Sequence, residues 1–232
     1  MANTRKFKPV THVIFDMDGL LLDTEDIYTK VFEELVAPYG KTFDWTIKAK
    51  MMGMTPQEGA KYIIKKLDLP ITEEHYYEWT TKKYAELMPT AKLLPGAEKI
   101  VRHLHKHKIP TGLSTGSDAE KFNTKTTNHR EFFKLFDPLV TCGSDPEVKH
   151  GKPHADAFLV PATRFPDKPD PAQCLAFEDS PNGVVSALNA GMQVVMVPHP
   201  NLDRSLCTNG TLVLNSLEEF CPEEFGLPAY DS

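Results

Sequence analysis

The stretch that decides the fold runs from His12 to Gly19 and reads His-Val-Ile-Phe-Asp-Met-Asp-Gly. Its apolar half, His12–Phe15, is typical of a buried strand, and two carboxylates, Asp16 and Asp18, follow at the end of that strand. Gly19 comes directly after them, so the backbone can turn sharply. Side chains two positions apart in an extended segment point the same way, so both acids can face one pocket. Such a pair is unfavourable for folding alone and useful for holding a cation or attacking phosphorus.

Two other structures fit acids at this position. One is a helix N-terminus capped by acids, which stays open on this motif alone. The other is an EF-hand calcium loop, which needs acids at alternating positions and a glycine at its sixth position. Here the glycine is fourth, and Leu20, Leu21 and Leu22 stand where further oxygen ligands belong. The pattern therefore argues against calcium.

The composition is that of an ordinary globular protein. The chain has 232 residues, of which 41% are hydrophobic and 25% charged. A formal net charge of −6 argues against non-specific nucleic-acid binding, which requires a basic surface. No apolar run reaches the ~18 residues that a membrane-spanning helix needs, so we expect no membrane partner. Nothing in the sequence specifies an oligomeric state, so a monomer is the default expectation.

The cysteines and the first residues bear on the compartment. Cys142, Cys174, Cys207 and Cys221 are scattered without a C-x-x-C pair, which suits reduced thiols better than a disulfide framework. The first residues, Met-Ala-Asn-Thr-Arg-Lys-Phe-Lys-Pro, lack an apolar signal core. We therefore expect a cytoplasmic protein.

Apolar runs that lead into a polar loop and then a helical pattern recur along the chain. They lie at His12–Phe15, Thr111–Ser114, Leu139–Thr141, Cys174–Phe177, Val194–Val197 and Thr211–Leu214. Their continuous apolar character predicts strands covered on both faces, as in a parallel sheet. Helices are predicted between them, for example over Gly96–Lys108 and, after Ser180 as N-cap, over Pro181–Ala190. This alternation predicts a doubly wound, Rossmann-like α/β core.

The stretch between Leu20 and Lys92 breaks this rhythm, because it contains helical signals and no good strand. Thr24, Thr55 and Thr72 can each cap a helix, and Thr55 opens the capping box Thr-Pro-Gln-Glu. We therefore predict a small all-helical domain inserted after the first strand.

The predicted domain division follows from this insert. Residues 20–92 form the helical domain, and residues 1–19 and 93–232 together form the α/β core. The last helix of the insert has an aromatic stripe made of Tyr76, Tyr77, Trp79 and Tyr84. Aromatic residues at helical spacing usually serve a core, so we predict packing rather than ligand binding.

Three further segments follow predicted strands or precede helices, where open α/β sheets bind ligands. Thr115 and Gly116 offer a hydroxyl and a backbone N–H that can hold phosphate oxygens, although turns often contain such residues. Lys152 stands next to a proline, and a solvated surface lysine is the ordinary alternative there. Glu178 and Asp179 follow an apolar run, and they can equally cap the helix that comes next.

Together these residues predict a magnesium site. Mg²⁺ takes oxygen ligands from one or two carboxylates, with water and substrate phosphate completing an octahedron. Asp16 and Asp179 could provide those carboxylates. Lys152 could then offset the charge that otherwise keeps an anionic phosphate away from Asp16.

The order of these motifs resembles the haloacid dehalogenase superfamily, in its phosphatase branch. The matching text is Asp-Met-Asp-Gly from Asp16, a hydroxyl after the second core strand, Gly-Lys-Pro around Lys152 and Glu-Asp-Ser-Pro-Asn-Gly from Glu178. The helical insert resembles that family's small cap domain. Stretches outside the motifs, at 94–99, 143–148 and 191–198, resemble the group that contains pseudouridine-5′-phosphatases, glycerol-phosphate phosphatases and flavin-mononucleotide hydrolases. The resemblance covers essentially the whole chain.

The resemblance implies an enzyme that hydrolyses phosphate monoesters through an aspartyl-phosphate. Asp16 would attack the phosphorus, and Asp18 would protonate the leaving alcohol and then deprotonate the hydrolytic water. Mg²⁺ would bind an Asp16 oxygen, the Asp18 carbonyl and the phosphate. Asp179 would complete the ligand set, with Glu178 nearby or ligating.

The same resemblance implies how the substrate is held. Thr115, the Gly116 amide and Lys152 would contact the phosphoryl oxygens, where charge spreads in the transition state. The cap would exclude water and read the leaving group through the loop Met52-Gly53-Met54. Met54 departs from the family, since several similar proteins have a basic residue there. His154, where relatives usually have a second proline, is expected to matter little because Lys152 is intact.

The partner implied by the resemblance is a small phosphorylated metabolite. Pseudouridine 5′-phosphate is the first expectation, and glycerol phosphate or another small metabolite is the alternative. A phosphosugar mutase of the β-phosphoglucomutase type uses the same core motifs and stays open. A dehalogenase is disfavoured because it needs neither Asp18 nor the Glu178-Asp179 pair. A non-catalytic binding module usually lacks the nucleophile or the lysine, and this chain has both.

Two groups of basic side chains lie outside these motifs. His103 and His107 are four apart on a predicted helix, a spacing that can bind zinc, but no further ligand stands near them in sequence. A solvated helix face is therefore expected. Lys125 belongs to a basic patch after the second core strand, for which we expect a supporting or surface role rather than substrate contact.

Overall fold

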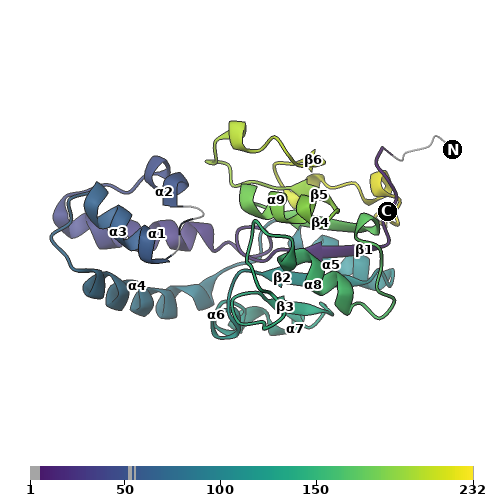
Figure 1. The fold of residues 1–232 in the computed structure, drawn as a ribbon, viewed down its shortest axis with the longest axis horizontal. Helices are drawn as coiled ribbons and strands as arrows, with labels where there is room; N and C mark the ends of the chain where they lie inside the picture. Colours follow the sequence, from purple (N-terminus) through teal and green to yellow (C-terminus); the bar gives the residue numbers. More distant parts are fainter. Residues whose placement is uncertain (1–5, 52–53, 55, 232) are drawn as a thin grey trace.

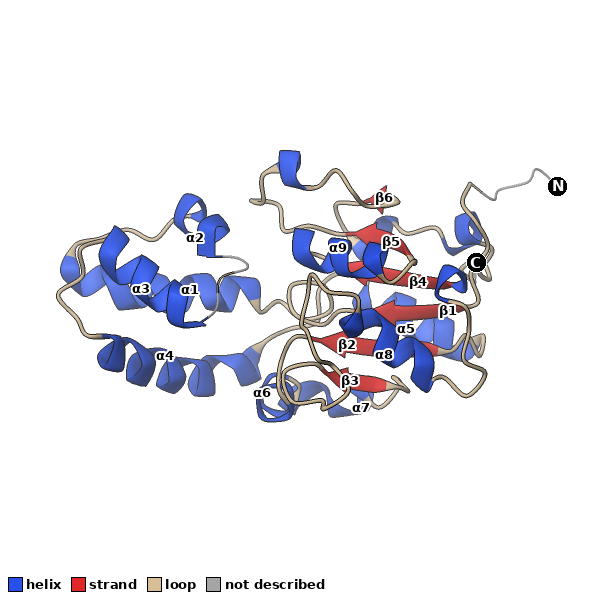
Figure 2. Ribbon diagram, viewed as in Figure 1, coloured by secondary structure: helices blue, strands red, loops and turns tan. Residues whose placement is uncertain are grey.

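The computed structural model describes residues 6–51, 54 and 56–231. Figure 1 shows a core of sheet and helices beside a separate lobe of helices, and Figure 2 shows the strands gathered in the core. The strands are β1 (His12–Phe15), β2 (Thr111–Thr115), β3 (Leu139–Thr141), β4 (Cys174–Glu178), β5 (Gln193–Met196) and β6 (Leu212–Val213). They agree with the predicted strands to within one residue at every end.

The sheet is parallel and its strand order is β3-β2-β1-β4-β5-β6. The chain winds outward from β1 to β3, returns to β4 on the other side of β1, and winds outward again. The order therefore reverses between β1 and β4, and doubly wound sheets form a ligand crevice at the carboxyl ends of the strands at such a point. The predicted doubly wound fold is confirmed.

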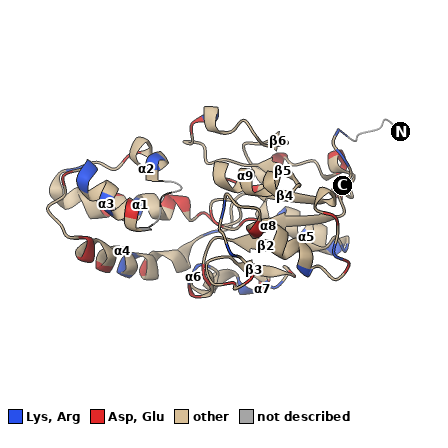
Figure 3. Ribbon diagram, viewed as in Figure 1, with Lys and Arg blue, Asp and Glu red and all other residues tan. Residues whose placement is uncertain are grey.

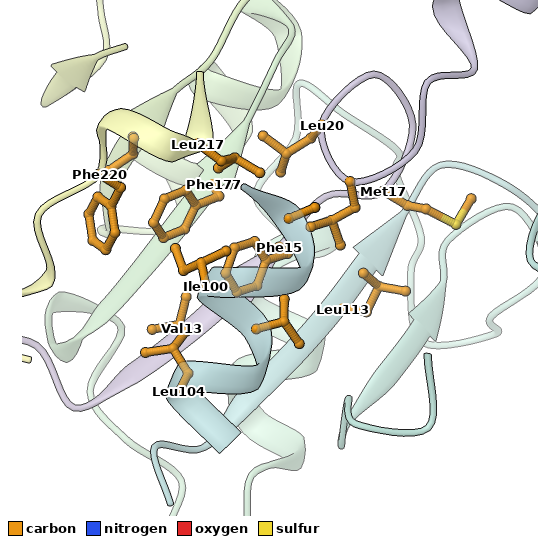
Figure 4. Packing of buried hydrophobic residues seen from close by; sticks show 14 of the residues in the cluster. Val13, Phe15, Met17, Leu20, Ile100, Leu104, Leu113, Phe177, Leu217 and Phe220 are labelled. Carbon is orange, nitrogen blue, oxygen red and sulfur yellow. The ribbon is translucent and has the colours of Figure 1, made fainter. Parts of the chain in front are cut away.

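Helices cover both faces of this sheet. They are α5 (Ala97–Lys106), α6 (Ala119–Lys125), α7 (Arg130–Phe133), α8 (Asp156–Arg164) and α9 (Pro181–Asn189). In β1, Val13 and Phe15 pack with α5, as Figure 4 shows, while Ile14 packs with α8 and α9 in a second cluster. All three side chains are fully buried, because alternate residues of the strand enter opposite layers. This two-sided burial fixes the end of β1 firmly in place.

The helical lobe lies between β1 and α5 in the sequence. It contains α1 (Glu25–Val36), α2 (Trp45–Met51), α3 (Pro56–Lys66) and α4 (Glu73–Leu87). These helices enclose their own hydrophobic cluster, in which Phe32, Ile47, Ile63 and Tyr76 are buried. Both acidic and basic residues lie along α4, as expected for a helix with a solvent-facing side (Figure 3). The predicted helical insert is therefore present.

The predicted helix caps and the aromatic stripe of the helical lobe can be compared with the structure. Thr72 caps α4, since its hydroxyl accepts a hydrogen bond from the His75 amide at 3.1 Å. Thr24 precedes α1, but its side chain makes no capping hydrogen bond, so the predicted cap is wrong in this respect. Thr55 lies outside the described residues. The aromatic stripe packs as expected, with Tyr77 and Trp79 against the lobe's cluster.

Among the described residues, no helix has both the length and the apolar character needed to cross a bilayer.

Candidate functional site

The candidate site forms where β1 and β4 end side by side. Phe15 is paired with Phe177 in the parallel ladder, and the Asp16 amide continues it by donating to the Phe177 carbonyl at 3.0 Å. Glu178 is the last residue of β4, and Asp179 follows it. The register of two adjacent strands thus brings three acids from distant parts of the sequence to one edge of the sheet.

These three acids form a buried cluster. One carboxylate oxygen from each of Asp16, Glu178 and Asp179 lies within 4.8 Å of the others. Asp16 and Asp179 are only 5% and 6% exposed, and Glu178 is completely buried. Close, desolvated carboxylates repel one another, so this arrangement requires a compensating cation.

Lys152 supplies part of that compensation. Its ammonium donates to Asp16 Oδ1 and, at 2.5 Å, to Glu178 Oε1. It also lies 3.4 Å from the Ser114 carbonyl at the end of β2. Both carboxylates raise the pKa of Lys152 above its ordinary value, against the opposing effect of burial. The lysine is therefore a charged group in the site and is not the solvated surface lysine of the alternative interpretation.

The other oxygen of Glu178 is held by the turn into α9. Its Oε2 accepts from the amides of Asp179 and Ser180 at 3.0 and 3.1 Å and from the Ser180 hydroxyl at 3.0 Å. A Cβ at Gly183 would lie 1.9 Å from this carboxyl group, so the first turn of α9 can approach only because residue 183 is glycine. Ser180 also caps α9, as predicted, by accepting from the Gly183 amide at 3.1 Å.

Gly19 has a similar role beside Asp179. Its φ of +76° lies in the left-handed region, which glycine adopts without strain. A Cβ there would stand 2.3 Å from Asp179 Oδ2. The turn after the Asp16-Met17-Asp18 segment therefore needs glycine for its backbone conformation and for the space that Asp179 occupies.

The electrostatics of the cluster favour binding of a further cation. Burial raises the pKa of Asp16 to about 8, with the Lys152 charge opposing the rise and Glu178 adding to it. Burial, followed by the charges of Glu178 and Asp16, raises the pKa of Asp179 well above its ordinary value. In the described part of the chain, one ammonium group thus contacts a cluster of three carboxyl groups. An all-oxygen donor set with excess negative charge fits a hard divalent cation such as Mg²⁺.

Asp18 faces a different set of partners. Lys125 donates to its Oδ1 at 2.6 Å, and the Thr115 and Ser117 hydroxyls each donate to its Oδ2 at 3.2 Å. Burial works to raise the pKa of Asp18, but the charge and hydrogen bond of Lys125 outweigh it and hold this pKa below its usual value. The carboxylate is thus fixed at both oxygens.

Thr115 and Gly116 lie at the end of β2, as predicted, beside Asp18. The Thr115 hydroxyl accepts from the Ser117 amide at 3.1 Å, so it orders the loop and also reaches Asp18. A Cβ at Gly116 would meet no atom within 4 Å, which leaves open space next to its backbone.

The helical lobe contributes Glu25 and Lys48 near the site. A Cβ at Gly19 would lie 3.0 Å from Glu25 Cγ and 2.3 Å from Asp179 Oδ2, so Glu25 and Asp179 both border the Gly19 turn. The Lys48 ammonium is 2.7 Å from Glu25 Oε2, 2.7 Å from the Glu25 carbonyl and 2.9 Å from the Thr29 hydroxyl. Lys48 is 5% exposed, so α1 and α2 are joined by a buried ion pair at the site's edge.

Contacts between aromatic and charged groups connect the lobe to the core. The Trp45 ring of α2 stacks on His199, with ring centroids 4.2 Å apart, and His199 also lies 3.3 Å from Asp26 of α1. In addition, the Lys125 ammonium lies 5.4 Å from the Tyr28 ring centroid. The lobe thus contacts the core at the loop after β5 and at the end of α6.

The predicted substrate-reading loop is only partly described. Met52 and Gly53 lie outside the described residues. Met54 is 36% exposed and lines a surface hollow with Glu58, Lys61, Tyr62 and Lys65 of α3. A role for this loop in substrate recognition therefore stays a prediction.

Lys125, Glu25 and Lys48 were not predicted as part of the site. For Lys125 a supporting or surface role was expected, and the structure favours the supporting one, since Lys125 is 3% exposed and pairs with Asp18. The sequence held one weak indication that Lys125 belongs to the site, because Lys125 stands one helix length after the Thr115-Gly116-Ser117 loop. Glu25 and Lys48 are ordinary helix residues in sequence, and their positions depend on how the lobe meets the core.

Comparisons of this sequence with known proteins point to one family. A family model described as haloacid dehalogenase-like hydrolase matches residues 13–197. A Drosophila melanogaster protein named probable pseudouridine-5′-phosphatase is 49% identical over 230 residues, which is 99% of each chain. The (DL)-glycerol-3-phosphatase 2 of Arabidopsis thaliana is 46% identical over 225 residues, which is 96% of this chain and 93% of that protein.

Solved structures agree on the fold. A HAD family hydrolase from Deinococcus radiodurans R1, with bound phosphate and sodium, superposes with a TM-score of 0.75 at 22% identity, covering 92% of this chain and 94% of that one. The β-phosphoglucomutase of Clostridium difficile superposes with a TM-score of 0.68 at 22% identity, covering 91% and 93%. At these identities the two structures show a common fold and no more.

Proposed function

The chain belongs to the haloacid dehalogenase-like hydrolase family and is a phosphatase, and we propose that it hydrolyses small phosphate monoesters through an aspartyl-phosphate on Asp16, with Mg²⁺ as cofactor. The family resemblance expected from the motifs is confirmed. The observation that supports the mechanism most directly is the buried cluster of Asp16, Glu178 and Asp179, in which the Lys152 ammonium pairs with Asp16 and Glu178.

Asp16 is the proposed nucleophile. An Asp16 oxygen forms a bond to phosphorus as the bond from phosphorus to the leaving oxygen breaks, so the phosphoryl group becomes an acyl phosphate. Asp16 is fixed for this by the buried strand β1 and by its contact with Lys152. The Lys152 charge favours the ionised, nucleophilic form and offsets repulsion between Asp16 and the incoming phosphate.

Asp18 is the proposed acid and base. It gives a proton to the leaving alkoxide, and in the second step it takes a proton from the water that attacks phosphorus and releases Asp16. Its carboxylate lies two residues from Asp16 and is oriented by Lys125, Thr115 and Ser117. The Gly116 amide and the Thr115 hydroxyl are proposed to contact phosphoryl oxygens together with Lys152.

Asp16, the Asp18 carbonyl and Asp179 are proposed to hold Mg²⁺, with Glu178 ligating or adjacent. The bound cation would neutralise the carboxylate cluster and the negative charge that accumulates on the phosphoryl oxygens. Because Glu178 already accepts from Lys152 and from three donors in the turn into α9, Asp16 and Asp179 have the more available oxygens.

Pseudouridine 5′-phosphate is the first proposed substrate, and glycerol phosphate is the alternative. The Drosophila relative is named for the first activity and the Arabidopsis relative for the second, at similar identity to this chain. Ranking the two requires kcat/KM for both compounds, measured in parallel with flavin mononucleotide and ribose 5-phosphate. A preference of at least tenfold for pseudouridine 5′-phosphate would support the first proposal.

The test of the mechanism is phosphate release from p-nitrophenyl phosphate and from both proposed substrates in the presence of Mg²⁺. Asp16→Asn is expected to lower the rate by more than about 10³-fold. Asp203→Asn, at an exposed acid of the core, is the matched control and should retain full activity. Residual hydrolysis by Asp16→Asn at the wild-type rate would overturn the proposal. Conversion of β-glucose 1-phosphate to the 6-phosphate without phosphate release would identify a mutase instead.

A further inference from the structure

The two histidines at the end of α5 lie in a setting that their sequence spacing did not reveal. His103 is 7% exposed, so the expected solvated helix face is wrong for this residue. Its ring centroid lies 4.5 Å from that of His107, one turn further along. The carboxylate of Asp231 reaches the same place from the C-terminal segment. One ligand atom from each of the three residues lies within 4.8 Å of the others.

His103 is oriented as metal-bound histidines are. Its Nε2 lies 2.9 Å from the Pro228 carbonyl oxygen, which can only accept, so Nε2 carries the proton. Nδ1 then keeps its lone pair. A histidine whose second nitrogen donates to a backbone carbonyl has its tautomer and ring orientation set, and this is the usual outer support of an imidazole ligand. Packing of the ring against Tyr230, at 4.7 Å between centroids, limits its rotation further.

The Nε2 nitrogen of His107 is buried and has no hydrogen-bond partner among the described residues. The nearest carboxylate oxygen, Asp231 Oδ1, is 3.6 Å away, which is beyond hydrogen-bond length. A buried nitrogen without a partner is unfavourable, and a bound ion between nitrogen and carboxylate would satisfy both.

We propose that His103, His107 and Asp231 form a second metal site, selective for a Zn²⁺-like transition metal, that fastens the C-terminal segment to α5. Two imidazoles and one carboxylate, with water as the fourth ligand, make a tetrahedral set that suits Zn²⁺. The all-oxygen cluster at Asp16 suits Mg²⁺ instead, so the two sites differ in the metal they select. The second site lies at the end of α5 that precedes β2, and Asp16 lies at the opposite edge of the sheet, which runs parallel throughout.

Lys106 is the competing partner of Asp231. Its ammonium lies 2.7 Å from Asp231 Oδ2, and both side chains are more than half exposed. Exposed ion pairs are weak because water screens them, so this pair does not prevent metal binding. A metal would use the other oxygen, Oδ1, which faces His107.

The test is a Zn²⁺ titration of the full chain, without an affinity tag, against a chromophoric chelator. Excess Mg²⁺ in the buffer occupies the carboxylate cluster. The wild type is expected to bind one Zn²⁺ per chain with a Kd below about 10 µM, and Zn²⁺ is expected to raise its Tm. His107→Ala and Asp231→Asn should each weaken Zn²⁺ binding at least tenfold and remove the rise in Tm.

His105→Ala is the matched control, because His105 is exposed on the same helix and lies outside the cluster. It should bind Zn²⁺ within twofold of the wild type. All three variants should keep wild-type phosphatase activity with Mg²⁺, which separates this proposal from the one for the catalytic site. A Kd for Zn²⁺ above about 10 µM would overturn the proposal. Binding of equal strength in His107→Ala would also overturn it, by placing the ion elsewhere, for example on a cysteine.

Discussion

The buried Lys125 and the partly buried Asp18 form an ion pair, with 2.6 Å between the ammonium nitrogen and Asp18 Oδ1. The same ammonium donates to the Ser117 hydroxyl at 2.9 Å, and that hydroxyl donates to the other oxygen of Asp18. Lys125 therefore fixes the orientation of the carboxylate that we propose as acid and base. Burial opposes its charge, but Asp18 more than compensates and raises the pKa of Lys125. The residue stays a cation throughout the working pH range.

Replacement of Lys125 should impair proton transfer to the leaving group. Lys125→Met leaves Asp18 without its charged partner, so we expect kcat for an alkyl phosphate such as glycerol phosphate to fall at least tenfold, with a smaller change in KM. The loss should be smaller for p-nitrophenyl phosphate, because p-nitrophenolate leaves without protonation. Lys125→Arg should restore part of kcat, and Lys121→Met, at an exposed lysine of the same helix, is the control. An equal loss for both substrates would indicate a purely structural role.

The stability of the metal-free protein should depend on pH through the carboxylate cluster. The pKa of Asp16 is raised from 3.8 to about 8, so between these values the folded chain binds more protons than the unfolded chain. The contribution of this group to stability is thus present at low pH and is lost as pH rises through that window. We expect the free energy of unfolding to fall by up to ~1.4 kcal/mol per pH unit from this source. Asp179 acts in the same direction.

Urea unfolding of the wild type and of Asp16→Asn between pH 5 and 8, with a chelator present, measures this effect. The variant has no ionisable group at residue 16, so its stability should fall less steeply with pH. Addition of Mg²⁺ should raise the unfolding midpoint of the wild type, and more at pH 8 than at pH 5. Identical slopes for the two proteins would contradict the assignment to Asp16.

Gly183 and Gly59 offer a matched pair of helical glycines. A Cβ at Gly183 would meet the Glu178 carboxyl group at 1.9 Å, whereas one at Gly59 would meet Met51 Cε at an ordinary 3.5 Å. Gly183→Ala should therefore destabilise the protein by about 1–3 kcal/mol and lower activity by displacing Glu178. Gly59→Ala should be neutral or stabilise it by up to ~1 kcal/mol, since alanine favours helix. Chemical denaturation and phosphate release measure the two effects, and equal behaviour of the variants would refute the close approach.

Lys48 should stabilise the junction between α1 and α2. Lys48→Met leaves Glu25, whose side chain is 17% exposed, without its partner and close to Asp179. We expect a loss of at least about 2 kcal/mol, because an uncompensated carboxylate is left largely buried. Lys50→Met, at an exposed lysine of α2, should change stability by less than about 0.5 kcal/mol. Differential scanning calorimetry of the two variants tests this prediction. Similar Tm values would mean that the Lys48–Glu25 ion pair contributes little to stability.

The order of elements was predictable because each depends on local signals. Continuous apolar runs specify strands that are covered on both faces, and β3 was predicted to the residue as Leu139–Thr141. The core acids were also predictable, since each stands directly after such a run. A parallel sheet places the carboxyl ends of its strands on one edge, so Asp16, Glu178 and Asp179 could be expected to meet.

The sequence by itself determined the fold class, the helical insert and the acids of the site, because strand ends and helix starts are encoded within a few neighbouring residues. Only the tertiary structure decided which side chains pair with those acids. Lys125 reaches Asp18 across 107 positions of sequence, and Asp231 reaches His107 across 124. Such contacts are set by the packing of helices on the sheet, and no local pattern encodes that packing. The side-chain partners of a charged group, and hence its pKa and its chemistry, are therefore a property of the folded chain.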